Sequence, residues 1–288
     1  MIINFPFPLR LLLRTMATLA AATVPLLAMR GAQANPRPLP FTYPYATLPE
    51  DSLEVEQYVD VTPLRASETN ADGSERRVWD RRYVLQTELE YGITDHLELG
   101  AYLVFAQDPS ASDPVMRFDG TKERLRYRLA EQGELPIDVA FYLETAQFHD
   151  ELELEEKLVL GKQLGKLSLQ ANAWIEQEFD RGKDGVLVFN PTLGLAYQAL
   201  SKLHVGIEYW ARGRFGHHHD LAEVGTSQTA SDFNASTHHF LGPTLSLQLG
   251  RLWWSVAPYL RLDHASRSAE VGDQFGKVWV RSVIGMDL

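Results

Sequence analysis

The sequence predicts an all-β protein, an antiparallel up-and-down transmembrane β-barrel of about 12 strands. Three observations lead to this fold class. Apolar and polar residues alternate in one segment after another from residue 51 to the end of the chain. Short and long connections alternate between these segments, as in outer-membrane barrels. After residue 34, no apolar run approaches the length of about 18 residues that a membrane helix needs.

Residues 1–34 have the organisation of a secretory signal peptide. Arg10 and Arg14 precede an apolar run over residues 15–29, and the small residues Ala32 and Ala34 follow it. The run has 15 residues, which is short for a spanning helix of about 20. We therefore expect cleavage after Ala34 and export through the inner membrane. This removes three arginines and no acid, so 24 basic and 38 acidic residues remain, a net charge of −14.

Residues 35–50 form a separate segment ahead of the predicted barrel, which covers residues 51–288. The stretch "NPRPLPFTYPYATLPE" holds five prolines, which favour an extended chain over a helix or a central strand. We expect a Pro-rich periplasmic N-terminal segment. Its sequence does not indicate whether it enters the barrel.

The alternation defines the strands one by one. The fourth has the weakest apolar face, because Glu123 falls on it. Pro191, Pro243 and Pro258 fall within three others, and bulges are expected there because proline cannot donate to a ladder. The twelve expected strands cover about residues 52–62, 82–92, 96–105, 121–130, 137–147, 151–161, 166–176, 187–198, 202–212, 239–249, 253–263 and 277–288.

The connections predict which end of the barrel is which. The short links include "GITD", "KQLG", "ALS" and "GRLW", and the longest links are residues 63–81 and 213–238. Short turns are typical of the periplasmic side, and an even strand count places both termini there. Outward aromatic residues near the strand ends suit the two bilayer interfaces: Tyr83, Tyr91, Phe105, Tyr197 and Trp254.

A secreted soluble sandwich or lipocalin-like barrel would also show alternating apolar and polar residues. Twelve regular strands with few charges on their apolar faces favour the membrane barrel instead.

Apolar faces toward lipid would turn the charged faces toward the lumen. The stretch "KERLRYR" at 122–128 is a basic ladder between acidic strands, so cross-strand charge pairing is expected. The lumen is then either a charged constriction that selects solutes or an ion-pair network that fills a non-conducting barrel, since twelve strands is an intermediate size. The predicted pore-lining residues are Glu88, Glu90, Glu98, Lys122, Arg124, Arg126, Arg128, Asp138, Glu144, Glu153, Glu155 and Arg281.

Two stretches carry a family resemblance. "RYVLQTELEYGITDHLELGAYLVF" and "FTYPYATLPEDSLEVEQYVD", with the closing strand, resemble proteobacterial outer-membrane β-barrel proteins, in particular an uncharacterised group of porin- or transporter-like barrels. The resemblance implies a porin-like channel or passive transporter for small solutes in the outer membrane. It also implies contact with outer-membrane lipid and lipopolysaccharide, and folding by the barrel-assembly machinery. Such barrels often end in Phe or Trp, whereas this chain ends in Leu288.

Other classes of function have weaker support. The acidic balance argues against nucleic acid, and the lack of cysteine excludes a disulfide framework and thiolate metal sites. The histidines of "GHHHD" (216–220), with His238 and His239, could bind a metal, but a polar surface loop is the favoured interpretation and we expect no metal or other cofactor. Ser236 and Ser246 lie near histidines without forming a catalytic arrangement, so we expect no enzyme.

Overall fold

The computed structural model describes residues 36–69, 75–107, 115–149, 151–180, 185–215, 237–263 and 276–288, leaving aside the side chains of residues 64–80 and 180. The predicted signal peptide therefore lies outside the described residues. Regular structure in these ranges is entirely β-strand. They contain no helix long and apolar enough to cross a membrane.

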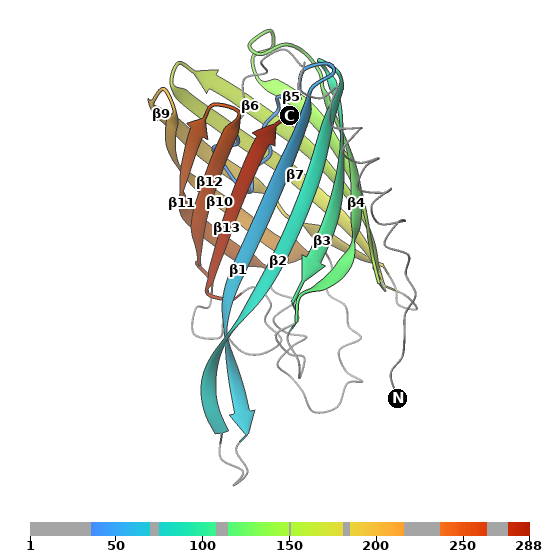
Figure 1. Cartoon of the computed structure of the whole chain (residues 1–288), viewed down its shortest axis with the longest axis vertical. Helices are drawn as coiled ribbons and strands as arrows, with labels where there is room; N and C mark the ends of the chain where they lie inside the picture. Colours follow the sequence, from blue (N-terminus) through green and yellow to red (C-terminus); the bar gives the residue numbers. More distant parts are fainter. Residues whose placement is uncertain are drawn as a thin grey trace, which may run out of the picture.

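The strands follow one another in an antiparallel meander (Figure 1). Each pairs with its neighbours in the chain, and the sheet closes where the last strand pairs with the first. In chain order they are β1 (Leu53–Thr69), β2 (Glu75–Thr94), β3 (Leu97–Ala106), β4 (Arg117–Arg128), β5 (Asp138–Phe148), β6 (Glu151–Leu164), β7 (Leu167–Asp180), β8 (Val186–Phe189), β9 (Thr192–Leu200), β10 (Leu203–Arg214), β11 (His238–Leu249), β12 (Leu252–Arg261) and β13 (Val278–Asp287).

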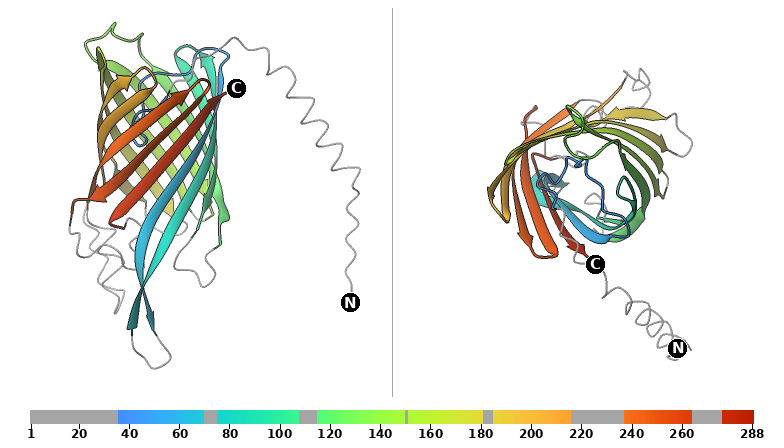
Figure 2. Two further views of the ribbon diagram at one scale, coloured as in Figure 1. Left: turned by 60° about the vertical axis from the view of Figure 1, so that its left-hand side comes forward. Right: turned by 90° about the horizontal axis from the view of Figure 1, so that it is seen from above.

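The barrel wall has twelve strands, because β8 and β9 are two pieces of one. Both pair with β7 on one side and β10 on the other, and their register is the same on either side of Asn190 and Pro191. The ring of strands is closed in the view from above (Figure 2, right). The predicted closed antiparallel barrel of twelve strands is confirmed.

The prolines act differently from the prediction. Bulges were expected, but the strands keep their register and lose only local ladder pairing. Pro191 separates β8 from β9, while Pro243 and Pro258 lie opposite each other in the gap between the Leu241–Leu260 and Leu245–Val256 pairs. Two missing N–H donors thus fall at one place on the β11–β12 seam, which disturbs the ladder less than two separate losses would.

The link predicted over residues 63–81 is also different. Most of it is paired backbone, because β1 and β2 continue as a hairpin from Pro63–Arg81 to Thr69–Glu75 without a change of register. The hairpin extends beyond the end of the barrel (Figure 1). Backbone pairing needs no alternation of side chains once a strand has left the wall, and this is why the sequence pattern gave no sign of it.

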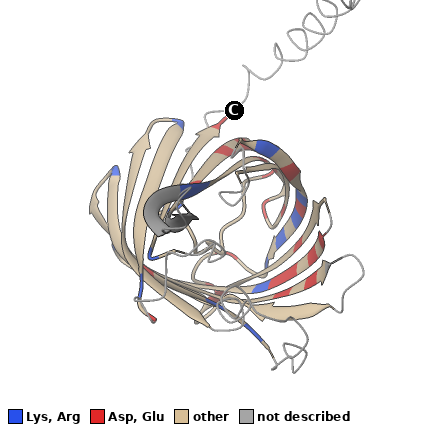
Figure 3. Ribbon diagram, turned by 90° about the horizontal axis from the view of Figure 1, so that it is seen from below, with Lys and Arg blue, Asp and Glu red and all other residues tan. Residues whose placement is uncertain are grey.

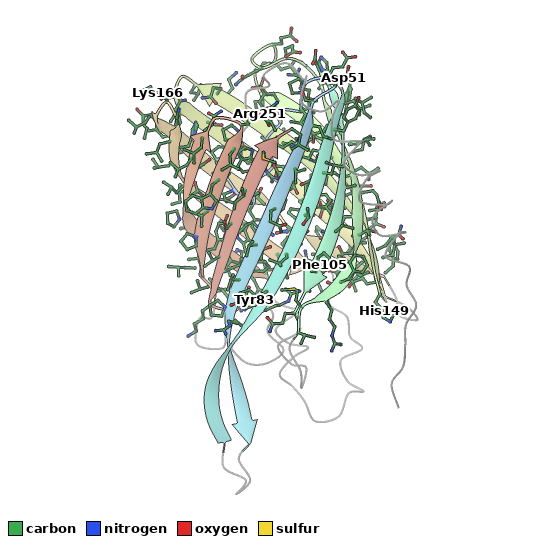
Figure 4. All side chains as sticks on the ribbon, in the orientation of Figure 1. Asp51, Tyr83, Phe105, His149, Lys166 and Arg251 are labelled. Atoms are coloured by element: carbon green, nitrogen blue, oxygen red, sulfur yellow. The ribbon has the colours of Figure 1, made fainter. Side chains whose placement is uncertain are left out.

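Side chains alternate between an exposed outer face and a buried inner face, as the example of β3 shows. Leu99 and Leu103 on the outside are 43% and 49% exposed, whereas Glu98 and Tyr102 on the inside are 0% and 3% exposed. Figure 4 shows side chains projecting outward along both visible edges of the barrel. Apolar residues therefore cover most of the outside, with exceptions such as Glu123 and Glu156, and many polar and charged residues are enclosed.

The two ends of the barrel differ in their connections. Asp51, Lys166 and Arg251 mark one end, which we call the turn end, and Tyr83, Phe105 and His149 mark the other, which we call the loop end (Figure 4). Two tight connections at the turn end contain Gly165 (φ +61°) and Gly250 (φ +72°), a backbone conformation that glycine adopts without strain.

An arginine at mid-height on the outer face tests whether this face meets lipid. Leu143, in the middle of β5, is 44% exposed. In lipid vesicles, Leu143→Arg is expected to lower the free energy of unfolding by about 2–4 kcal/mol, because the charge lies at the bilayer centre. The matched control is Gln147→Arg, near the loop end of the same strand, with an expected cost of about 0–1 kcal/mol. Urea titrations followed by tryptophan fluorescence measure both, and equal costs would contradict a lipid-facing wall.

Candidate functional site

Residues 36–48 lie inside the barrel, against the inner face of the wall (Figure 2, right). We call them the lumenal segment. Leu39, Phe41, Tyr43 and Leu48 are all less than 9% exposed. The Pro-rich composition predicts an extended chain, but the sequence did not place this chain inside the barrel.

Side chains of the wall bind the backbone of the lumenal segment. Glu208 on β10 accepts hydrogen bonds from the N–H groups of Phe41 (3.1 Å) and Thr42 (2.5 Å). Asn172 on β7 accepts one from the Tyr43 N–H (2.8 Å) and donates one to the Tyr43 carbonyl (3.1 Å). Glu98 accepts one from the Leu48 N–H (2.7 Å). An extended segment without a ladder partner needs such acceptors, because its buried N–H groups would otherwise be unsatisfied.

Two glycines of the wall provide space for the lumenal segment. A Cβ atom on Gly161 of β6 would lie 2.7 Å from the ring of Tyr45, and one on Gly194 of β9 would lie 2.4 Å from Leu39. Both distances are shorter than van der Waals contact. A larger residue at either position would therefore displace the segment. The position of the lumenal segment thus depends on the sequence of the wall as well as on the sequence of the segment.

Phe41 is enclosed by aromatic residues from several strands. We call the set of Trp174, Trp210, Tyr259 and Trp279 the aromatic box. The Phe41 ring stacks on Trp210 with a centroid distance of 4.3 Å and an interplanar angle of 8°. Tyr259 and Trp279 approach it edge-on at 5.8 Å and 6.0 Å. Such stacked and edge-to-face contacts stabilise the position of the ring beyond the burial of its area.

Arg37 fixes the beginning of the lumenal segment. Its guanidinium donates to Glu56 (2.9 Å) and to the Tyr58 hydroxyl, and lies 4.1 Å from the centroid of the Tyr43 ring. The Ser255 hydroxyl donates to its carbonyl. The beginning of the segment is therefore held by β1 and β12, the two strands on either side of β13.

The predicted basic ladder of β4 forms ion pairs in the way the sequence indicated. Arg124 pairs with Glu88, Glu90 and, at 2.5 Å, Glu98. Arg126 pairs with Glu98 at 2.8 Å. All five side chains are at least 96% buried. Buried charges of this kind are tolerated only when each has direct partners. We call this group the arginine–carboxylate cluster.

Gly100 allows Arg124 to reach two strands across the wall. The glycine lies on β3 between Glu90 and Arg124 in the register, and a Cβ atom there would lie 2.6 Å from Nε of Arg124. The sequence predicted the charges of the cluster. It did not predict that the Arg124 side chain extends over Gly100, because a lone glycine in a strand has several explanations.

The remaining predicted residues lie at several different places. Lys122 pairs with Glu144 at 3.0 Å, and Glu155 pairs with Lys157. The Lys157 ammonium also lies 4.1 Å, 3.9 Å and 3.6 Å from the ring centroids of Tyr43, Tyr142 and Trp174.

The last four predicted residues do not join this group. Arg281 on β13 pairs with Asp60 on β1 at 2.7 Å. Glu153 is half-buried and stands opposite Glu178 in the register. Asp138 and Arg128 lie at the turn end, where Asp138 accepts from the Gly133 N–H (2.6 Å) and Arg128 pairs with Glu131 (2.7 Å).

Charged residues gather on one side of the barrel (Figure 3). The strands there carry the arginine–carboxylate cluster and the carboxylates of β6 and β7, including the directly opposed pairs Glu153–Glu178 and Glu155–Glu176. Strands β10 to β13 contribute large buried aromatic residues to the other side, among them Trp253, Phe240 and Tyr259. The interior thus has one charged and one largely aromatic wall.

The histidine pair His238–His239 belongs to a polar network at the loop end. His238 Nδ1 lies 3.1 Å from Asp263, and the His239 N–H donates to the same carboxylate at 2.7 Å. Although burial opposes its charge, hydrogen bonds from His239, His238 and Arg261 hold the pKa of Asp263 below its usual range. The "GHHHD" stretch lies outside the described residues.

Of the residues considered for catalysis, Ser246 does not meet the histidines His238 and His239. Ser246 is eight residues from His238 along β11, which is about 26 Å of extended strand. Ser246 is fully buried on the inner face, opposite Ser255. Ser236 lies outside the described residues.

Comparisons with known proteins concern the fold. Comparisons with protein-family models and with curated protein sequences find no match. Among solved structures, the NanC porin matches with a TM-score of 0.55 and 9% identity, over 82% of this chain and all of that one. An outer-membrane channel from Pseudomonas putida F1 matches with a TM-score of 0.55 and 10% identity, over 85% of this chain and 98% of that one. The fold is that of outer-membrane porins and channels. At this identity the likeness concerns architecture alone.

Removing one arginine tests the arginine–carboxylate cluster. Arg124→Gln leaves buried carboxylates without a partner and is expected to lower the free energy of unfolding by about 3–5 kcal/mol. Arg128→Gln is the matched control, because its partner Glu131 is 53% exposed, and a cost of about 0–1 kcal/mol is expected there. Urea unfolding in vesicles measures both, and a similar small cost for Arg124→Gln would contradict the importance of these pairs.

Proposed function

We propose that the protein is an outer-membrane channel for small, water-soluble solutes, with a lumen narrowed by the lumenal segment. One observation carries the proposal: a closed twelve-stranded barrel with an apolar outside encloses polar and charged side chains. Such an arrangement suits a wall between lipid and water. The two porin and channel structures of similar fold support it at the level of architecture.

This proposal includes a location and partners. The apolar outer face would contact outer-membrane lipid and lipopolysaccharide, and the exported chain would be inserted by the barrel-assembly machinery. The twelve predicted pore-lining residues, Glu88 to Arg281, would set the charge of the pathway. We propose no enzymatic activity.

A specific observation favours the alternative, a barrel that conducts nothing. The arginine–carboxylate cluster is almost completely buried, and the lumenal segment binds to side chains on strands from β1 to β12. If the segment never leaves, the barrel is a structural membrane protein. Conductance decides between the two functions.

Removing the lumenal segment is expected to widen the pathway. Refolded protein without residues 36–48 should show single-channel conductance several-fold above that of the full mature chain in planar bilayers, because pore conductance grows with free cross-section. A chain in which residues 36–48 are replaced by a Gly-Ser repeat of equal length is the matched control, and it should behave like the deletion. If neither variant conducts, the channel proposal fails.

The carboxylates of β6 and β7 are expected to make the channel prefer cations. Under a salt gradient, the reversal potential of the segment-deleted channel should have the sign of cation selectivity, because rings of carboxylates favour cations. Replacing Glu151, Glu153 and Glu178 with Gln should reduce this potential. The matched control is Glu156→Gln on the outer face of β6, which is exposed away from the lumen and should change nothing. Anion selectivity would contradict the assignment of these residues to the pathway.

A further inference from the structure

Glu208 differs from most other buried carboxylates of the barrel. It is 0% exposed, yet its partners are neutral donors: the N–H groups of Phe41 and Thr42 and the Tyr259 hydroxyl. Among the described residues no cation pairs with it directly, whereas Glu88, Glu98 and Glu144 each contact an arginine or a lysine. A fully buried carboxylate without a counter-cation is costly, so a cation delivered to this place would be strongly favoured.

Phe41 contacts both this carboxylate and the aromatic box. The ring lies in the aromatic box, and the N–H of the same residue binds Glu208. Ring and nitrogen are separated by two carbons, Cβ and Cα. The same skeleton, a ring followed by two carbons and a nitrogen, defines the 2-arylethylamines. In these compounds the nitrogen is a full ammonium, which would supply the charge that the backbone N–H lacks.

The surroundings tolerate an ammonium group. Arg281 lies 4.0 Å from the centroid of the Phe41 ring, but Asp60 binds it through two hydrogen bonds of 2.8 Å and 2.7 Å and offsets its charge. Nearby, the barrel already holds one ammonium in this manner, because Lys157 lies among three aromatic rings and pairs with Glu155. Aromatic faces and a carboxylate together are a recurrent arrangement for binding organic cations.

We propose that the aromatic box and Glu208 form a binding site for arylalkylamines, in which Phe41 of the lumenal segment takes the place of the solute. The proposal rests on the proposed function, because it names the class of solute that the channel would carry. A free amine must displace a competitor that is tethered to the barrel and therefore present at high effective concentration. The full chain consequently binds weakly, and the chain without residues 36–48 binds well.

The test is a calorimetric titration of refolded protein in detergent with 2-phenylethylammonium. The segment-deleted chain, shown to be folded by its heat-modifiable migration on a gel, should bind with a dissociation constant at least about tenfold lower than that of the full mature chain. Glu208→Gln in the deleted chain should weaken binding at least about tenfold, because it removes the charge that pairs with the ammonium. Glu156→Gln, on the outer face of the wall, is the matched control and should leave binding unchanged.

Two control ligands separate the parts of the site. The anion 3-phenylpropionate has the same ring, and n-butylammonium has the same charge without a ring; neither should bind comparably. Equal affinity for the anion, or no effect of Glu208→Gln, would overturn the proposal. If the deleted chain does not fold, the full chain with Phe41→Ala takes its place, and the absence of any gain over the unmodified chain would equally overturn it.

The titration tests the binding site and the conductance measurement tests the channel, and either proposal can fail without the other. The titration involves no membrane and no current, so a negative titration leaves the conductance of the deleted chain as it is. A barrel that binds the amine but carries no current would contradict the channel and leave the binding site in place.

Discussion

The contents of the barrel depend on one constraint: a polar group enclosed by the wall is costly to bury unless it finds a partner inside it. The lumenal segment brings buried N–H groups without a ladder, and Glu208, Asn172 and Glu98 accept them. The same requirement pairs Arg124 on β4 with Glu88 and Glu90 on β2 and with Glu98 on β3. Because unpaired groups in a low-dielectric interior are costly, the segment and the charged wall hold each other in place.

This constraint also limits what a solute can do in the lumen. A solute that enters must replace hydrogen bonds that the protein already makes with itself. Where each carboxylate already contacts a guanidinium, as around Arg124, a cation has less to gain. Where a carboxylate has only neutral donors, as at Glu208, a cation has more to gain. The barrel therefore combines a region whose carboxylates already pair with arginine and a second region, at Glu208, that can still accept a cationic ligand.

The sequence predicted the wall well and its contents poorly. Alternation of apolar and polar residues defined twelve strands, and it placed Glu88, Glu98 and Arg124 on one face, because the period of two is a local property. The extension of β1 and β2 past Pro63 and Arg81 carried no such signal. The position of Phe41 could not be predicted either, because it depends on contacts with Glu208, 167 residues away in the chain, and on the space that Gly194 leaves for Leu39 of the same segment.

The seating of the lumenal segment is the central claim, and the lack of native cysteine allows a direct measurement of it. In the folded protein, Leu39→Cys and Glu50→Cys are compared for their rate of reaction with a membrane-impermeant thiol reagent. Leu39 is fully buried and Glu50 is exposed. The structure predicts that the cysteine at 39 reacts at least about tenfold more slowly, because it is protected by the wall. Equal rates at the two positions would show that the segment does not occupy the lumen.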